Sequence, residues 1–211
     1  MNNFCTKRKL IYLHPPKTAG KSLEQVLFNI TPLNSTSNHM KLSTMMNKKV
    51  DVGSSGIDFH QLLFGHEHII NDWIILISVR NPWDRLVSTY YQGNIPQSKT
   101  RAEPTVKVIG GDFKKWVMDE RNPVQCQVDW LKTEHKIFTP DYIIRMESIQ
   151  EDWDKLPLEF RHDKQNVDKL PKINPSKHKH YTTYYDDELK EYVTKKYSED
   201  IIHFNYKFDN Y

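Results

Sequence analysis

The stretch Leu10-Ile11-Tyr12-Leu13-His14-Pro15-Pro16-Lys17-Thr18-Ala19-Gly20-Lys21-Ser22 decides the fold that we predict for this chain. Its first four residues are apolar and are followed by His14 and two prolines, a pattern typical of a buried strand that ends in a loop. After the loop, apolar residues recur with the spacing of one helix face: Leu23, Val26, Leu27 and Ile30. A strand, a loop of small, hydroxyl and lysine residues and a helix together favour phosphate binding, because the helix N-terminus attracts anions.

A second strand, loop and helix follow from residue 73 onward. Residues 73–79 (WIILISV) are apolar except Ser78, as expected of a strand covered on both faces of a parallel sheet. Asn81 and Pro82 then suit the N-cap and the first position of a helix that ends near Gly93. A third buried strand is expected over residues 142–146. The chain is therefore predicted to be α/β, a P-loop-like three-layer fold with a central, mainly parallel sheet flanked by helices.

Shorter elements complete the prediction. Short helices are expected over residues 113–118 and 124–131 and around Trp153, and a final helix over residues 187–197. A short apolar run at residues 62–64 is predicted to be a strand that carries His66 and His68 beyond its C-terminal end. Residues 34–60 and 95–122 are the least interpretable, and an acceptor pocket built from them cannot be read from the sequence.

Composition limits the classes of protein that this chain can be. With 211 residues it is predicted to form one domain over residues 1–211. The net charge of +3 is low for a general nucleic-acid binder, so no nucleic-acid partner is expected. No apolar run approaches the roughly 20 residues that span a bilayer, so no membrane partner is expected. A polar N-terminus and two cysteines, Cys5 and Cys126, favour a cytoplasmic location with reduced thiols.

The loop ends like a Walker A motif but departs from it at its start. Gly20-Lys21-Ser22 matches the ending, whereas Pro15 stands where the first glycine of that motif would allow the backbone to wrap a phosphate. No apolar strand ends in an aspartate that would hold Mg²⁺, and the strand over residues 73–79 is followed by Arg80 instead. An arginine at that position indicates a second anion bound directly, without a metal.

These two segments resemble the nucleotide-binding motifs of sulfotransferases. Residues 16–22 look like the 5′-phosphosulfate loop of that family, and residues 80–90 look like its 3′-phosphate motif. The resemblance is closer to the carbohydrate sulfotransferase branch, whose loop reads HxPKTAGTS; Lys21 stands where that branch usually has threonine. Later segments continue the similarity: residues 127–131, 145–147, 174–177 and 206–208.

The resemblance implies a donor and a set of binding residues. The donor would be 3′-phosphoadenosine 5′-phosphosulfate (PAPS) and the product adenosine 3′,5′-bisphosphate (PAP), with no metal. The 5′-phosphate would be held by the backbone of Thr18, Ala19 and Gly20 together with Lys21 and Ser22. Arg80 and Ser88 would hold the 3′-phosphate. Lys17 would stabilise charge on the leaving oxygen. The basic stretch Lys172–His180 is either a solvated loop or a cover over the nucleotide or an anionic sugar, with Lys177 as its nucleotide contact.

Sulfuryl transfer also needs a base for the acceptor hydroxyl. His66 is the first candidate, because a neutral imidazole with an unperturbed pKa near ~6.5 suits this work at neutral pH, and His68 is the second. Two other interpretations remain: both are ordinary histidines, or they form a zinc site with His60, which no cysteine or carboxylate pattern supports.

The predicted function is therefore sulfuryl transfer from PAPS to a hydroxyl acceptor, expected to be a carbohydrate. Two alternatives stay open. One is a P-loop kinase for a small metabolite that uses ATP–Mg²⁺ and Lys21. The other is a nucleotide- or polyanion-binding module without turnover.

Overall fold

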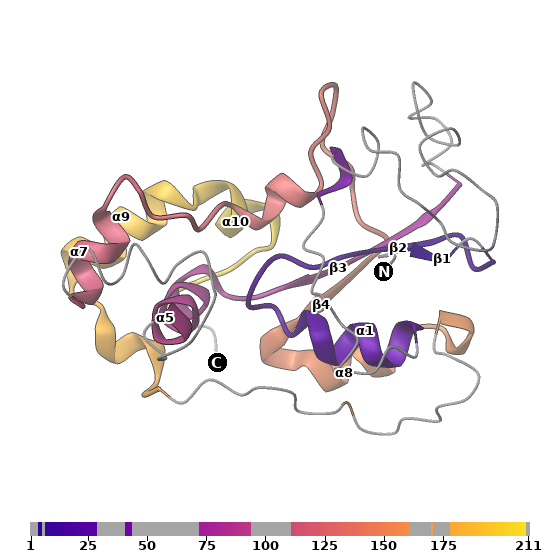
Figure 1. Ribbon diagram of the computed structural model, residues 1–211, viewed down its shortest axis with the longest axis horizontal. Helices are drawn as coiled ribbons and strands as arrows, with labels where there is room; N and C mark the ends of the chain where they lie inside the picture. The colour runs from indigo at the N-terminus through magenta and orange to yellow at the C-terminus, as the bar shows by residue number, and fades with distance from the viewer. Residues whose placement is uncertain are drawn as a thin grey trace. The chain divides into compact units, whose positions relative to one another are not determined.

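The computed structural model describes residues 4–5, 7–28, 41–43, 72–93, 111–160, 170 and 178–209 (Figure 1). Residue contacts divide the chain into two compact units. The first comprises Met1–Val79 and Asp129–Ile173, and the second comprises Arg80–Val128 and Asn174–Tyr211. The prediction of a single domain over residues 1–211 stays a prediction. The strand expected at residues 62–64 lies outside the described residues.

The first unit is built on a four-stranded sheet in the order β1-β2-β3-β4. These strands are β1 (Phe4–Cys5), β2 (Leu10–Leu13), β3 (Ile74–Val79) and β4 (Tyr142–Arg145). The last three are parallel, and β1 pairs antiparallel with β2. Parallel neighbours place their C-terminal ends at one edge of the sheet, which is where ligands bind in α/β proteins. The predicted α/β fold with a mainly parallel sheet flanked by helices is confirmed.

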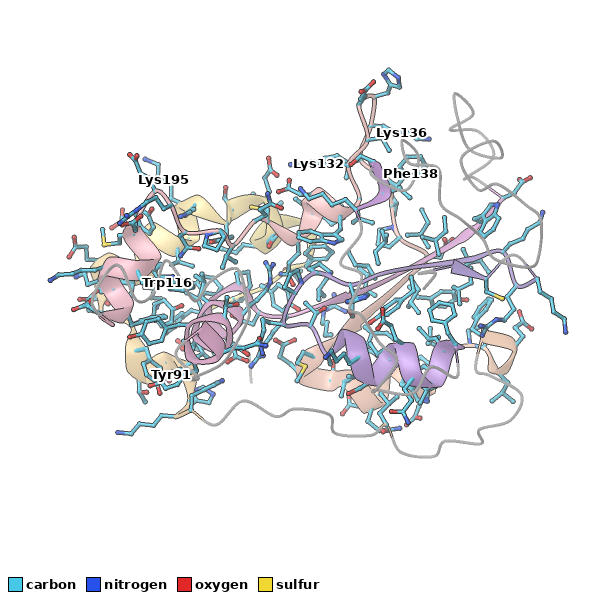
Figure 2. The ribbon with its side chains drawn as sticks, in the orientation of Figure 1. Tyr91, Trp116, Lys132, Lys136, Phe138 and Lys195 are labelled. Carbon is cyan, nitrogen blue, oxygen red and sulfur yellow. The ribbon has the colours of Figure 1, made fainter. Side chains whose placement is uncertain are left out.

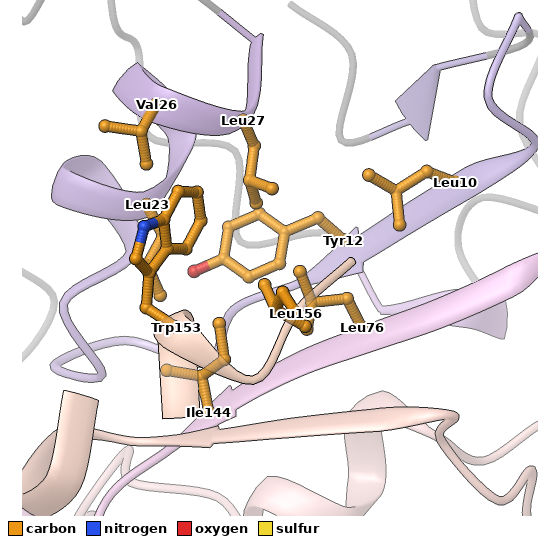
Figure 3. Packing of buried hydrophobic residues seen from close by; sticks show 9 residues of the cluster. All are labelled: Leu10, Tyr12, Leu23, Val26, Leu27, Leu76, Ile144, Trp153 and Leu156. Atoms are coloured by element: carbon orange, nitrogen blue, oxygen red, sulfur yellow. The ribbon is translucent and has the colours of Figure 1, made fainter. Parts of the chain in front are cut away.

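One face of this sheet is covered by α1 (Gly20–Phe28) and α8 (Ile149–Asp154), as Figure 3 shows from close by. Alternate strand residues point to this face, because side chains alternate along a strand. Burying each large apolar side chain contributes about 1.5–3 kcal/mol. The cluster thereby fixes α1 against the end of β2, and it consists of Leu10, Tyr12, Leu23, Val26, Leu27, Leu76, Ile144, Trp153 and Leu156.

The second unit is helical and is centred on α5 (Pro82–Gly93), which begins at the predicted proline. The side chain of Asn81 caps it, since its Oδ1 accepts from the backbone N–H of Trp83 at 3.0 Å. Around α5 pack α7 (Phe113–Met118) and α9 (Asp187–Lys196), and α10 (Ser198–His203) follows α9. Tyr91 and Trp116, labelled in Figure 2, both pack their rings against Tyr90.

Short 3-10 turns complete the described chain: η3 (Gln127–Trp130), η4 (Met146–Ser148), η5 (Leu158–Phe160) and η6 (Tyr181–Tyr184). The helix expected over residues 124–131 is limited to η3. Its first two backbone N–H groups, those of Gln127 and Val128, donate to the Asp200 carboxylate. Within the described part of the chain, no helix combines the length and the apolar character that crossing a membrane requires.

Candidate functional site

The loop between β2 and α1 has an unusual backbone. Lys17 has a φ of 74° and Ala19 a φ of 60°, so two non-glycine residues separated by Thr18 adopt the left-handed region. That conformation costs an L-residue roughly 1–2 kcal/mol, so the surrounding structure must hold it in place. Alternation of left-handed and right-handed residues is typical of the concave backbone nests in which proteins bind anions. The sequence predicts the loop here, but not these conformations, because neither position is a glycine.

A chain of buried hydroxyl groups ties this loop to the sheet. Thr18 Oγ1 donates to the carbonyl of Pro15 at 2.7 Å and lies 2.9 Å from Ser78 Oγ, which in turn lies 2.9 Å from the Tyr12 hydroxyl. Since the Thr18 proton goes to Pro15, Ser78 donates to Thr18 and Tyr12 donates to Ser78. Burial raises the pKa of Tyr12 well above its usual value and keeps that hydroxyl protonated. The Thr18 side chain is thus structural, and only its backbone is suited to contact a phosphate.

A buried histidine and carboxylate lie beneath the same loop. His14 Nε2 is 2.7 Å from Glu24 Oε1, and their side chains are 0% and 5% exposed. The His14 ring stacks on Tyr12 with 5.3 Å between the ring centroids. A Cβ on Gly20 would lie 2.2 Å from His14 Nδ1, so only glycine permits this close approach. Sequence analysis missed this pair; the signal was a histidine at the end of a strand and a glutamate on the buried face of the helix.

The beginning of α1 follows directly after this loop. The backbone N–H groups of Ser22 and Leu23 both donate to the carbonyl of Ala19, at 3.0 and 3.3 Å. The first turn of α1 contains no acidic residue, so the positive dipole end of the helix has no carboxylate of that turn beside it. Lys17 and Lys21 are half-buried, and Ser22 is buried. The loop residues predicted to bind the 5′-phosphate, Thr18 to Ser22, thus lie together around one helix N-terminus.

Arg80, in the second unit, lies between the end of β3 and the start of α5. Its Nε and Nη2 each lie 2.8 Å from Asp84 Oδ2, and both residues are buried, at 7% and 8% exposure. Arg80 therefore forms a buried ion pair with Asp84, its neighbour one helical turn along the chain. Ser88, the other predicted 3′-phosphate residue, is fully buried within α5.

The backbone of Arg80 is held by a side chain far away in the sequence. Gln127 Oε1 accepts from the Arg80 N–H at 2.8 Å, and Gln127 Nε2 donates to the Arg80 carbonyl at 2.8 Å. Asp200 accepts from the backbone N–H groups of Gln127 and Val128, both at 2.8 Å. Sequence analysis missed Gln127 and Asp200, because no local pattern pairs residues so widely separated in the chain.

Two ionisable residues next to this network, Asp200 and Arg85, are both buried. Burial raises the pKa of Asp200, while the nearby charge of Arg85 and three hydrogen bonds act in the opposite direction. Burial lowers the pKa of Arg85, and the charge of Asp200 raises it. Arg85 also donates through Nη1 to the carbonyl of Gln125 at 2.8 Å. The second arginine of this motif is therefore buried and bonded within the protein, whereas Arg80 is predicted to bind the nucleotide.

Several predicted site residues lie outside the described residues: His60, His66, His68 and Lys177. Their predicted roles stay predictions. In the described ranges, no three histidine, cysteine or carboxylate side chains gather in a way that could hold a metal ion.

A comparison with models of protein families extends these motifs to nearly the whole chain. The model described as the sulfotransferase family matches residues 2–207. The chain belongs to the sulfotransferase family. A sulfotransferase moves a sulfuryl group from a nucleotide donor to a hydroxyl acceptor, and this activity class follows from the match. The carbohydrate branch stays a prediction for this sulfotransferase. Searches of curated proteins and of solved structures found no match.

Proposed function

We propose that this protein transfers the sulfuryl group of PAPS to a hydroxyl group of a carbohydrate. The observation that carries the proposal is the β2–α1 loop, in which Lys17 and Ala19 are left-handed and which leads directly into the N-terminus of α1. PAPS supplies a sulfuryl group activated by its bond to phosphate. A loop with this backbone, two lysines and a helix N-terminus suits the negative charge and the oxygen acceptors of that 5′-phosphosulfate.

Lys17 is proposed to stabilise the leaving group. The bond between sulfur and the bridging oxygen breaks as the acceptor oxygen bonds to sulfur, and negative charge then collects on the 5′-phosphate. A lysine held in place before the reaction stabilises this charge more in the transition state than in the ground state, which raises the rate. Lys21 and Ser22, in the first turn of α1, bind the same phosphate in the ground state.

Arg80 and Ser88 are proposed to bind the 3′-phosphate, with Lys177 as a further nucleotide contact. This assignment rests on the resemblance of residues 80–90 to the 3′-phosphate motif and on the position of Arg80 directly after β3. A guanidinium binds phosphate through charge-assisted hydrogen bonds, each contributing about 1.5–3 kcal/mol. His66, or His68 in its place, is proposed to take the proton of the acceptor hydroxyl.

The deciding experiment is calorimetric titration of the protein with adenosine 3′,5′-bisphosphate and, separately, with ATP–Mg²⁺. The proposal predicts that the bisphosphate binds more tightly and that Mg²⁺ does not change its affinity, because lysine and arginine groups neutralise the phosphates directly. Tighter binding of ATP–Mg²⁺ would contradict the proposal and favour the kinase.

Transfer from PAPS to a panel of glycans, tyrosine peptides and small alcohols then tests the acceptor. A glycan is expected to be sulfated fastest, and His66→Ala and His68→Ala, compared side by side, identify the base. Bisphosphate binding without sulfation of any acceptor would instead favour the binding module.

A further inference from the structure

Arg80 lies between the last residue of β3 and the N-cap of α5, and both of its backbone polar groups bond to one side chain. β3 ends at Val79, and the first carbonyl of the α5 ladder is that of Asn81, which accepts from Arg85 N–H at 2.8 Å. Arg80 lies between these two residues. Its N–H and carbonyl both go to one amide, that of Gln127, at 2.8 Å each. Two bonds from one planar amide fix the orientation of the Arg80 backbone, and hence the direction in which its side chain leaves the chain.

The amide of Gln127 is held in one orientation. Its Nε2 lies 3.2 Å from Asp200 Oδ2, and its own backbone N–H donates to the same oxygen at 2.8 Å. A carboxylate only accepts hydrogen bonds, so the NH₂ side of the amide must face Asp200 and the Arg80 carbonyl. The amide oxygen then faces the Arg80 N–H. Asp200 is 0% exposed, so water does not compete for these bonds.

The other end of Arg80 is held by Asp84, which accepts from Nε and Nη2 of the guanidinium. Asp84 belongs to the first turn of α5, whose N-cap is Asn81. The backbone and the charged head of Arg80 are therefore fixed by different groups, Gln127 and Asp84. A side chain held at both ends loses little conformational freedom when it binds a ligand.

We infer that Gln127, oriented by Asp200, is a positioning residue that sets the geometry of Arg80 for the 3′-phosphate of the nucleotide. This inference rests on the proposed role of Arg80 in binding that phosphate. It assigns the preference for a 3′-phosphorylated nucleotide to a buried amide that need not touch the nucleotide.

The test is a ratio of two dissociation constants, measured for adenosine 5′-monophosphate and for adenosine 3′,5′-bisphosphate. The two ligands differ only in the 3′-phosphate, so the ratio isolates the contribution of the 3′-phosphate site, to which Arg80 is proposed to belong. Gln127→Met keeps the length of the side chain and removes both bonds to Arg80. We expect this substitution to raise the dissociation constant of the bisphosphate about tenfold and that of the monophosphate less than about twofold. Asp200→Asn keeps the Gln127 amide but weakens the bonds that orient it. We expect this variant to change the ratio of the two dissociation constants in the same direction as Gln127→Met, but by a smaller factor.

The matched control is Val193→Ala, which removes buried methyl groups from α9 in the same unit. It lowers stability without touching the network, so its ratio should equal that of the unmodified protein. Each protein is measured well below its own unfolding midpoint, and Asp200→Asn decides the test if Gln127→Met does not fold.

The outcomes separate the inference from the proposed function. If the unmodified protein does not prefer the bisphosphate, the proposed role of Arg80 fails. If the preference exists and survives in a folded Gln127 or Asp200 variant, the positioning role is overturned. An equal loss of affinity for both ligands, as from general destabilisation, overturns it as well.

Discussion

Lys17 and Lys21 are both half-buried residues of the segment proposed to bind the 5′-phosphate, but they differ in backbone conformation. Lys17 is left-handed within the loop, whereas Lys21 is the second residue of α1. A Walker-type site would depend on Lys21, and a sulfotransferase site on Lys17. The two lysines therefore offer a matched pair of variants within five residues of chain.

We predict that Lys17→Ala lowers kcat for sulfuryl transfer by about 10²–10³-fold, because it removes a cation that stabilises charge in the transition state. Lys21→Ala should mainly raise the dissociation constant for the bisphosphate, by about tenfold, with a much smaller effect on kcat. Steady-state kinetics and calorimetry on both variants check this. The reverse order of the two effects on kcat would contradict the role of Lys17.

At the scale of single residues, the sequence predicts where a residue lies in the fold but not which groups its side chain contacts. It identifies Thr18 as a loop residue at a phosphate site, but the structure uses the hydroxyl of Thr18 to bond Pro15 and Ser78. The buried pair of His14 and Glu24 escapes prediction because a charged residue on a helix is expected to face solvent. Both features depend on how β2, β3 and α1 meet in space, which no local pattern encodes.

At the scale of secondary-structure elements, the junction of the β2–α1 loop and α1 restricts which side chains can stand at positions 19 and 20. Gly20 contacts the His14 ring, and that ring is held by Glu24, so it cannot move aside without breaking a buried bond. Ala19, the residue before it, is left-handed with a φ of 60°. Both positions therefore favour glycine, for different reasons: position 20 has no space for a side chain, and glycine at position 19 would relieve the strain of the left-handed backbone.

We predict that Gly20→Ala destabilises the protein by about 1–3 kcal/mol, because the added methyl group meets a buried ring. Ala19→Gly should be neutral or stabilising by up to about 1 kcal/mol, because glycine adopts the left-handed region without strain. Unfolding in urea monitored by tryptophan fluorescence measures both. Equal effects of the two substitutions would show that the contact with His14 does not limit position 20.

The strands and main helices were predictable because the apolar side chains of each element follow a regular spacing along the sequence and are buried on one or both of its faces. β2, β3 and β4 follow apolar runs, and α5 begins where Asn81 and Pro82 indicate. Long-range polar contacts were not predictable. Gln127 and Asp200 are polar residues in segments without periodicity, and their partners lie 47 and 73 residues away.

At the scale of the whole molecule, the sequence predicts one domain, while contacts divide the chain into two compact units that each contain two chain segments. The chain passes from one unit to the other at Val79–Arg80, where only two residues separate β3 from α5. It passes again at Val128–Asp129, inside η3. These two crossings lie inside or directly beside secondary structure, so we expect the two units to unfold together.

We therefore predict a single thermal transition in scanning calorimetry, with a calorimetric enthalpy equal to the van't Hoff enthalpy. Adenosine 3′,5′-bisphosphate at 100 times its dissociation constant adds about 2.7 kcal/mol of stability, since it binds only the native state. For a chain of this size the midpoint should rise by about 5–10 °C, and adenosine, which lacks both phosphates, should leave it unchanged. Two resolved transitions would contradict the single domain. A bisphosphate-independent midpoint would mean that the ligand does not bind the native state, whichever number of transitions is seen.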